Sequence, residues 1–116
     1  MNLLTKLFGS STPELDAQAV SARLAEDQPP LILDVREPQE YRRGHIAGAR
    51  PIPLGALAQR MGALPRDREI VCVCQSGNRS RAAVNQLAAA GYQALNLRGG
   101  MLAWAGANLP VKTGDR

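Results

Sequence analysis

The sequence is poor in the residues from which metal centres and disulfide frameworks are usually built. Its 116 positions include one histidine and two cysteines, Cys72 and Cys74. No second cysteine pair exists to complete a zinc site, so we expect no metal. A disulfide between alternate residues of a strand would be strained, because their Cβ vectors are nearly parallel. Two free thiols favour a reducing compartment, and we expect a cytoplasmic protein.

Long hydrophobic runs and basic runs are also missing. No stretch is long enough to span a bilayer, and residues 1–8 are too short and too interrupted for a secretory signal. We expect residues 1–11 to form a leader and linker, whose role the sequence leaves open. The net charge is +4, but aromatic residues are only 3% of the chain, and the pattern does not indicate nucleic-acid binding. The positive excess favours small anions or an acidic protein partner, or it belongs to a solvated surface.

Composition and patterning predict one small α/β domain. Hydrophobic residues make up 45% of the chain, which is enough for a core of Ala, Leu, Val and Ile. Strand and helix patterns alternate, as in domains with a parallel sheet. We place the domain at residues 12–111 and expect residues 112–116 to fray. The expected strands are 31–35, 70–73 and 93–97, with an irregular or edge passage at 45–53; the expected helices are 13–25 (capped by Thr12), 39–43, 54–61, one ending near Gly91 and a short one around Trp104.

Residues 69–84 carry the strongest chemical signal. The apolar run 70–73 reads as a central strand, and good helix formers follow the polar segment 74–80. A strand, a tight turn and a helix place backbone N–H groups and the positive end of the helix dipole around one point. A cysteine at that point, Cys74, is expected to have a lowered pKa and to act as a nucleophile.

The residues after Cys74 suit an anion-binding turn that we expect to run to Arg79. Gly77 permits a positive φ, and Arg79 offers a bidentate fork for an anion. Cys72 lies inside the apolar strand, so we expect it to be buried and inert. A purely structural role for Cys74 is the disfavoured alternative, because structural thiols sit in apolar surroundings. The candidate substrate-binding residues are Gln75, Ser76, Gly77, Asn78, Arg79 and Ser80.

Polar residues outside this turn are weaker candidates. Asp34 and Arg36 follow a buried strand, at the sheet edge where α/β proteins bind ligands. A carboxylate leaving a buried strand usually needs a partner, which favours a supporting network over the alternative, a surface ion pair. His45 could act as a base, although a lone histidine is more often structural. Arg98 is a candidate anion contact, with a structural role equally favoured.

Three segments together resemble the single-domain rhodaneses, the thiosulfate and persulfide sulfurtransferases. They are Cys-Gln-Ser-Gly-Asn-Arg-Ser at 74–80, the long segment 34–53, and Gly-Gly followed by Trp at 99–104. The resemblance implies a three-layer α/β sandwich with a five-stranded, mostly parallel sheet and helices on both faces. It also implies that Asp34 and Arg36 support the active-site loop.

The resemblance implies a sulfurtransferase without metal or organic cofactor. Cys74 would take sulfur from thiosulfate or a persulfide, with Arg79 binding the sulfonate end, and pass it from a persulfide to cyanide or a thiol, which could belong to a protein. A carrier or non-catalytic module is the alternative. A cysteine phosphatase or arsenate reductase is less favoured, because only four residues separate Cys74 from Arg79 and the turn holds no acid. A redox role for Cys72 and Cys74 is weaker still.

Overall fold

The computed structural model describes residues 12–115, which form a five-stranded sheet. The strand order is β1-β5-β4-β2-β3, and every neighbouring pair is parallel. The predicted α/β class and five-stranded sheet are therefore confirmed. The strands are β1 (Glu14–Leu15), β2 (Leu31–Asp34), β3 (Arg50–Pro51), β4 (Ile70–Val73) and β5 (Ala94–Leu97).

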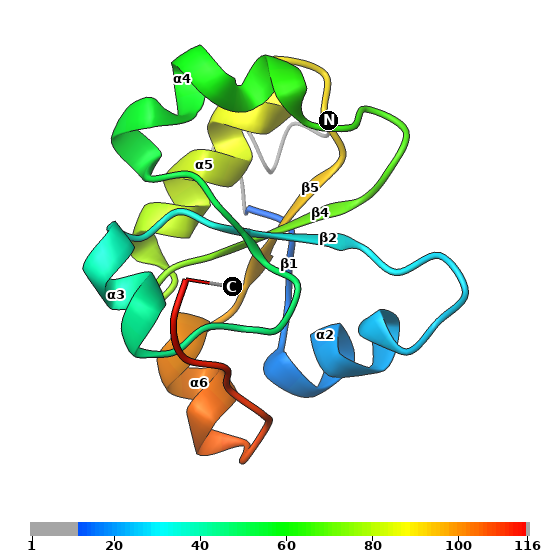
Figure 1. The fold of residues 1–116 in the computed structure, drawn as a ribbon. Coiled ribbons are helices and arrows are strands. Elements are labelled where there is room, and N and C mark those ends of the chain that lie inside the picture. The colour runs from blue at the N-terminus through cyan, green and yellow to red at the C-terminus, as the bar shows by residue number, and fades with distance from the viewer. Residues whose placement is uncertain (1–11, 116) are drawn as a thin grey trace, which may run out of the picture.

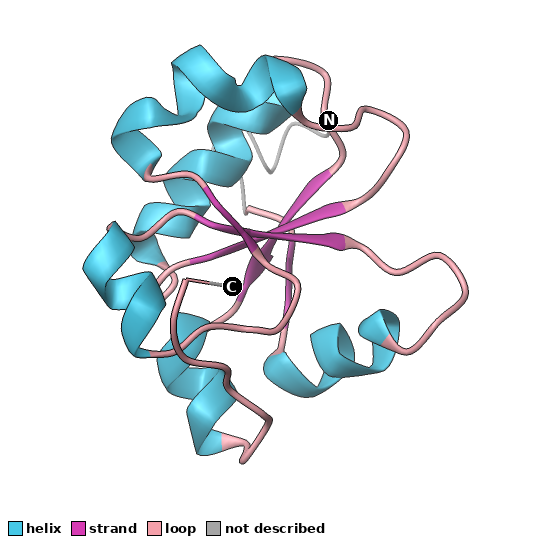
Figure 2. Ribbon diagram, viewed as in Figure 1, coloured by secondary structure: helices cyan, strands magenta, loops and turns pink. Residues whose placement is uncertain are grey.

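Helices cover both faces of this sheet (Figure 1, Figure 2). One face packs against α4 (Leu57–Arg60) and α5 (Asn78–Ala89), and the other against α2 (Ala17–Leu24), α3 (Pro38–Arg43) and α6 (Gly100–Gly106). The 3₁₀ turns η1 (Leu54–Ala56) and η2 (Met61–Ala63) flank α4. The predicted three-layer arrangement is confirmed.

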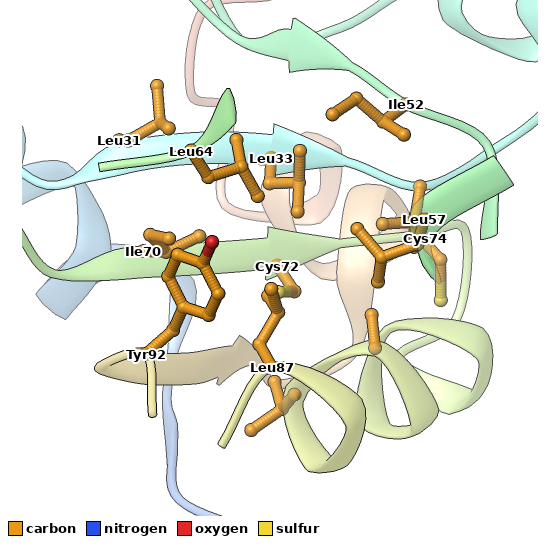
Figure 3. Close-up of a cluster of buried hydrophobic side chains, with 13 residues drawn as sticks. Leu31, Leu33, Ile52, Leu57, Leu64, Ile70, Cys72, Cys74, Leu87 and Tyr92 are labelled. Carbon is orange, nitrogen blue, oxygen red and sulfur yellow. The ribbon is translucent and has the colours of Figure 1, made fainter. Parts of the chain in front are cut away.

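The central strand β4 holds the layers together because both of its faces are apolar. Ile70 and Cys72 belong to the core beside α5, whereas Val71 and Val73 belong to the core beside α2 and α6. All four are fully buried. Figure 3 shows Cys72 among the side chains between β4 and α5. Because side chains alternate between the two faces of a strand, this one apolar run contributes to both cores.

The first predicted helix is wrong at its start. Residues 14–15 form the edge strand β1, and α2 begins only after Asp16, whose carboxylate accepts a hydrogen bond of 2.8 Å from the Ala19 N–H. The N–H groups of Asn96 and Arg98 donate to the carbonyls of Pro13 and Leu15, at and just before this edge strand. Pairing with β5 therefore overrides the local helix signal at Thr12 and Pro13.

The end of the domain also differs from expectation. Lys112 does not fray: it pairs with His45 through two backbone hydrogen bonds of 2.8 and 2.9 Å. The Gly114 N–H donates to the Arg42 carbonyl at 2.9 Å. The segment after α6 is thus fastened beside α3. The predicted leader lies outside the described residues, and none of the helices described is long and apolar enough to cross a membrane.

Candidate active site

The loop after β4 is tighter than expected. α5 begins at Asn78, and Gly77 caps it with φ 100°. Arg79 therefore lies in the first turn of the helix, and the loop proper comprises residues 74–77. Gly77 is needed here because a side chain at this φ would be strained and its Cβ would lie 3.2 Å from the Gly99 nitrogen.

The sulfur of Cys74 sits at the bottom of this loop. The residue is 1% exposed, the Gly77 N–H donates to Sγ at 3.1 Å, and Ser80 Oγ lies 3.3 Å from Sγ. Burial acts to raise the pKa of the thiol, but hydrogen bonds from the Ser80 hydroxyl and from the N–H groups of Ser80, Gly77 and Ser76 outweigh it. The pKa of Cys74 is therefore lowered, as a nucleophilic thiol requires.

The neighbouring thiol behaves in the opposite way. Cys72 is fully buried in β4, and burial, followed by the charge of Cys74, raises its pKa to about 12. Two cysteines one residue apart thus have opposite chemistry, because only Cys74 receives hydrogen bonds from the loop. This agrees with an inert Cys72.

α6 fixes the loop from the other side through Gly100. A Cβ on this residue would lie 2.3 Å from the Cys74 carbonyl oxygen and 2.7 Å from the Gln75 carbonyl carbon. Without that Cβ, the Met101 N–H donates to the Cys74 carbonyl at 2.8 Å and the Leu102 N–H to the Gln75 carbonyl at 3.1 Å. The start of α6 therefore holds the backbone of the reactive residue.

Asp34 and Arg36 form a buried ion pair. Arg36 Nη2 donates to Asp34 Oδ2 at 2.8 Å, and the two residues are 3% and 1% exposed. The same guanidinium donates to the Gly44 carbonyl at 2.7 Å and to Gln75 Oε1 at 3.3 Å. The pair thus connects the end of β2 to α3 and to the loop.

Arg79 has a partner that the sequence did not indicate. Its two terminal nitrogens donate to the Glu40 carboxylate at 2.7 and 2.8 Å. This hydrogen bonding lowers the pKa of Glu40 to about 2 and raises the pKa of Arg79, which the charge of Cys74 raises further. The bidentate fork that we expected to face an anion is therefore held by α3, although its positive charge stays near the sulfur.

The remaining candidates divide between the loop and the rest of the fold. Ser76 is exposed on the loop and Asn78 is exposed at the start of α5, and the Ser76 N–H helps to lower the pKa of Cys74. Arg98 is paired with Glu14 at 3.0 Å. His45 is buried, stacks on Tyr41 and bonds the Tyr41 carbonyl through Nδ1 at 2.7 Å, as a structural histidine would.

Sequence reasoning missed Asn96 altogether. This β5 residue is fully buried, its Oδ1 accepts from the Ser80 hydroxyl at 2.5 Å, and its Nδ2 donates to the Gly77 carbonyl at 3.2 Å. A polar side chain in a buried strand needs such partners. An asparagine inside the predicted strand 93–97 was the available signal.

A cleft of about 470 Å³ opens beside the loop at Gln75. Its walls carry Leu102 and Val111, which are 60% and 44% exposed and are the two large hydrophobic side chains exposed within residues 12–115. Arg43 also lines the cleft and contributes a positive charge. The cleft is lined by Arg36, Glu40, Arg43, Gly44, Gln75, Met101, Leu102, Ala105 and Val111.

Within residues 12–115 no group of three or more His, Cys, Asp or Glu side chains is placed to hold a metal ion. The chemistry described so far resides in one thiol, its hydrogen-bond donors and the charges around it. These features suit nucleophilic attack and the binding of a small anion.

Residues 16–107 match the rhodanese-like domain family. The chain is 41% identical over 99 residues to a sulfurtransferase of Allochromatium vinosum, covering 84% of this chain and 92% of that protein. It is 38% identical over 98 residues to a putative sulfur carrier protein of Bacillus subtilis, covering 84% of this chain but spanning only 53% of that relative.

Solved structures agree with the sequence relatives. A rhodanese-related protein of Thermoplasma volcanium superposes with a TM-score of 0.81 at 32% identity, over 86% of this chain and 97% of that one. A thiosulfate sulfurtransferase of Pseudomonas aeruginosa gives the same TM-score at 28% identity, over 90% of this chain and 20% of that one. The loop at Cys74, the parallel sheet and these relatives lead to one conclusion: the chain belongs to the rhodanese-like domain family.

Proposed function

We propose that this protein is a sulfurtransferase that carries sulfur as a persulfide on Cys74. The observation that carries the proposal is the convergence of the Gly77 N–H and the Ser80 hydroxyl on a buried sulfur whose pKa is lowered. A thiolate stabilised in this way needs no general base before it attacks. Relatives named sulfurtransferase and sulfur carrier support the same class of reaction.

The reaction consists of two displacements. The Cys74 thiolate attacks the outer sulfur of thiosulfate, the sulfur–sulfur bond of the donor breaks, and sulfite leaves with the bonding electron pair. An acceptor thiolate or cyanide then attacks the outer sulfur of the Cys74 persulfide and regenerates the thiolate. The loop N–H groups stabilise negative charge that develops on sulfur in both steps.

Arg79 would contribute through its charge. Its fork is engaged by Glu40, so the guanidinium does not have to reorient to attract an anion toward the loop. A neutral persulfide donor needs less of this attraction than thiosulfate does. We therefore propose that both donor classes are used and that Arg79 favours the anionic one.

The cleft beside Gln75 favours a second candidate, transfer to the thiol of a protein partner. Leu102 and Val111 would contact apolar side chains of that partner, and Arg43 would contact a carboxylate. Free thiols at Cys72 and Cys74 fit a reducing compartment such as the cytoplasm. Leu102→Asp should increase the KM for a cysteine-containing acidic peptide as sulfur acceptor and leave the KM for cyanide unchanged.

The phosphatase alternative has less support. Only residues 75–78 separate Cys74 from Arg79, so the loop is short for a tetrahedral oxyanion. Glu40, an acidic side chain that lines the cleft beside the loop, is held by Arg79 with a pKa of about 2, which makes it a poor proton donor at neutral pH.

Intact mass tests the proposal directly. After incubation with thiosulfate and gentle desalting, the protein should gain one sulfur atom that a reductant removes, and Cys74→Ser should gain none. Cys72→Ala is the matched control and should gain sulfur as the wild type does. Absence of the gain in wild type with both thiosulfate and a small persulfide would refute the proposal.

A further inference from the structure

The hydroxyl of Ser80 has two acceptors and one proton. Its Oγ lies 2.5 Å from Asn96 Oδ1 and 3.3 Å from Cys74 Sγ, and Ser80 and Asn96 are both fully buried. A serine hydroxyl donates one hydrogen bond at a time. The bond that helps to stabilise the Cys74 thiolate is therefore in competition with a bond to a neutral amide oxygen.

The amide of Asn96 cannot avoid this competition by rotating. Its Nδ2 donates to the Gly77 carbonyl at 3.2 Å and lies 3.5 Å from Glu14 Oε2. Both of these oxygens can only accept, so the NH₂ group must face them. The orientation of the amide is thus fixed by its own neighbours, and Oδ1 is left facing Ser80.

We propose that Asn96 is a positioning residue that competes with Cys74 for the Ser80 proton and so keeps the Cys74 thiolate basic. In the thiol form, the Cys74 S–H donates to Ser80 Oγ and the Ser80 hydroxyl donates to Asn96. In the thiolate form, the hydroxyl turns to the sulfur, and Asn96 Oδ1 loses its donor. A buried acceptor without a donor costs free energy, so Asn96 favours the thiol.

This competition has a use in sulfur transfer. The nucleophilicity of a thiolate falls with its pKa, and the best attacking thiol has a pKa close to the ambient pH. The donors around Cys74 lower its pKa, and each further lowering reduces the nucleophilicity of the thiolate. When a persulfide forms, the negative charge moves to the outer sulfur, and the Ser80 hydroxyl can return to Asn96.

Other groups near the sulfur do not remove the effect of Asn96. Arg79 on α5 favours the thiolate but is paired with Glu40 on α3. Cys72 on β4 is neutral at working pH because its pKa is about 12. Glu14 on β1 lies beside Asn96 and is paired with Arg98.

The proposal is tested by the pKa of Cys74 in a double-mutant cycle, read from the ultraviolet absorbance of the thiolate. In the presence of Ser80, Asn96→Val should lower the pKa by about half to one unit, since valine fits a strand and offers no acceptor. In a Ser80→Ala background, the same change should not lower the pKa, because only the contacts of Nδ2 with the Gly77 carbonyl and Glu14 are then lost. Leu97→Val is the control for a small core change in β5 and should leave the pKa unchanged.

An unchanged or raised pKa in Asn96→Val, or equal shifts in both backgrounds, would overturn the proposal. If Asn96→Val does not fold, NMR on the unaltered protein decides: the Asn96 side-chain NH₂ resonances should titrate with the pKa of Cys74, and this titration should vanish in Ser80→Ala. Asn96 side-chain NH₂ resonances that do not change as Cys74 titrates would also overturn the proposal.

The role of this competition in catalysis rests on the proposed function, whereas the pKa measurement needs no turnover. If the pKa shifts as expected but the protein gains no sulfur, the proposed hydrogen-bond competition stands and the proposed sulfurtransferase activity is refuted. With thiosulfate at a pH above both pKa values, Asn96→Val should form the persulfide about threefold more slowly per unit of pKa lost, from a Brønsted coefficient of about 0.45. The acid limb of its pH profile should move to lower pH.

Discussion

Substituting alanine for Gly100 tests whether the start of α6 positions the reactive loop. The added Cβ would lie 2.3 Å from the Cys74 carbonyl oxygen, and real Cβ contacts keep at least 3.0 Å. The loop or the helix must therefore shift by about 0.7 Å. Gly100 also has φ +58°, where alanine is strained by about 1–2 kcal/mol.

Both effects have a predictable size. The shift weakens the bonds from Met101 and Leu102 to the loop carbonyls, each of which contributes about 0.5–1.5 kcal/mol. Together with the strained φ, we expect Gly100→Ala to lower the free energy of unfolding by about 2–4 kcal/mol. A displacement of about 1 Å at a reacting atom can cost about 100-fold in rate, so turnover should fall by about 10- to 100-fold.

Two glycines of the same segment serve as controls, with urea unfolding and thiosulfate-to-cyanide turnover as the assays. Gly106→Ala meets no atom within 4 Å and should be neutral or slightly stabilising. Gly99→Ala has φ +75°, and its Cβ would lie 2.7 Å from the Ala103 Cβ within α6 rather than against the reactive loop, so it should lose stability with less loss of turnover. If Gly100→Ala keeps turnover within twofold of wild type, or loses no more turnover than Gly99→Ala, the close approach does not position the loop.

Three further predictions concern charges and thiols near the loop. Because Arg79 holds the pKa of Glu40 at about 2, below its ordinary 4.5, the pair stabilises the fold above pH 4.5 and loses that contribution as the pH falls toward 2. The pair is partly exposed, so its contribution to the free energy of unfolding is at most about 1 kcal/mol. Chemical denaturation should show that wild type loses this amount over the pH range and that Glu40→Gln does not. Equal acid sensitivity of the two proteins would contradict the pairing. At neutral pH iodoacetamide should modify Cys74 alone, and Cys72→Ala should retain turnover with a stability loss of about 1 kcal/mol; a dead Cys72→Ala would point to a two-cysteine mechanism.

Much of the fold was predictable because it follows from short apolar runs. Residues 70–73 are apolar on both faces, and this pattern alone places them at the centre of a covered parallel sheet. The edge strand β1 was not predictable in the same way. Its two residues form a strand only because β5 supplies hydrogen-bond partners, and a distant partner leaves no local pattern.

In the candidate site, too, the features set by local sequence were predictable and those set by distant contacts were not. Cys74 and its loop were identifiable because the chemistry is contiguous in sequence and the geometry of a strand, turn and helix is general. The pairing of Glu40 with Arg79 joins residues 39 positions apart, and it depends on how α3 and α5 pack. Asn96 was missed for a similar reason, since its partners Ser80 and Gly77 come from another element.

Both edges of the sheet end in strands of two residues, β1 and β3. A strand this short offers few free backbone groups to an added strand, and in β3 Pro51 lacks an N–H altogether. Neither edge therefore favours growth of the sheet by a second copy or by a neighbouring domain. Short edges of this kind favour association through side chains on helices and loops, which would let a partner dock and leave without unpairing the sheet.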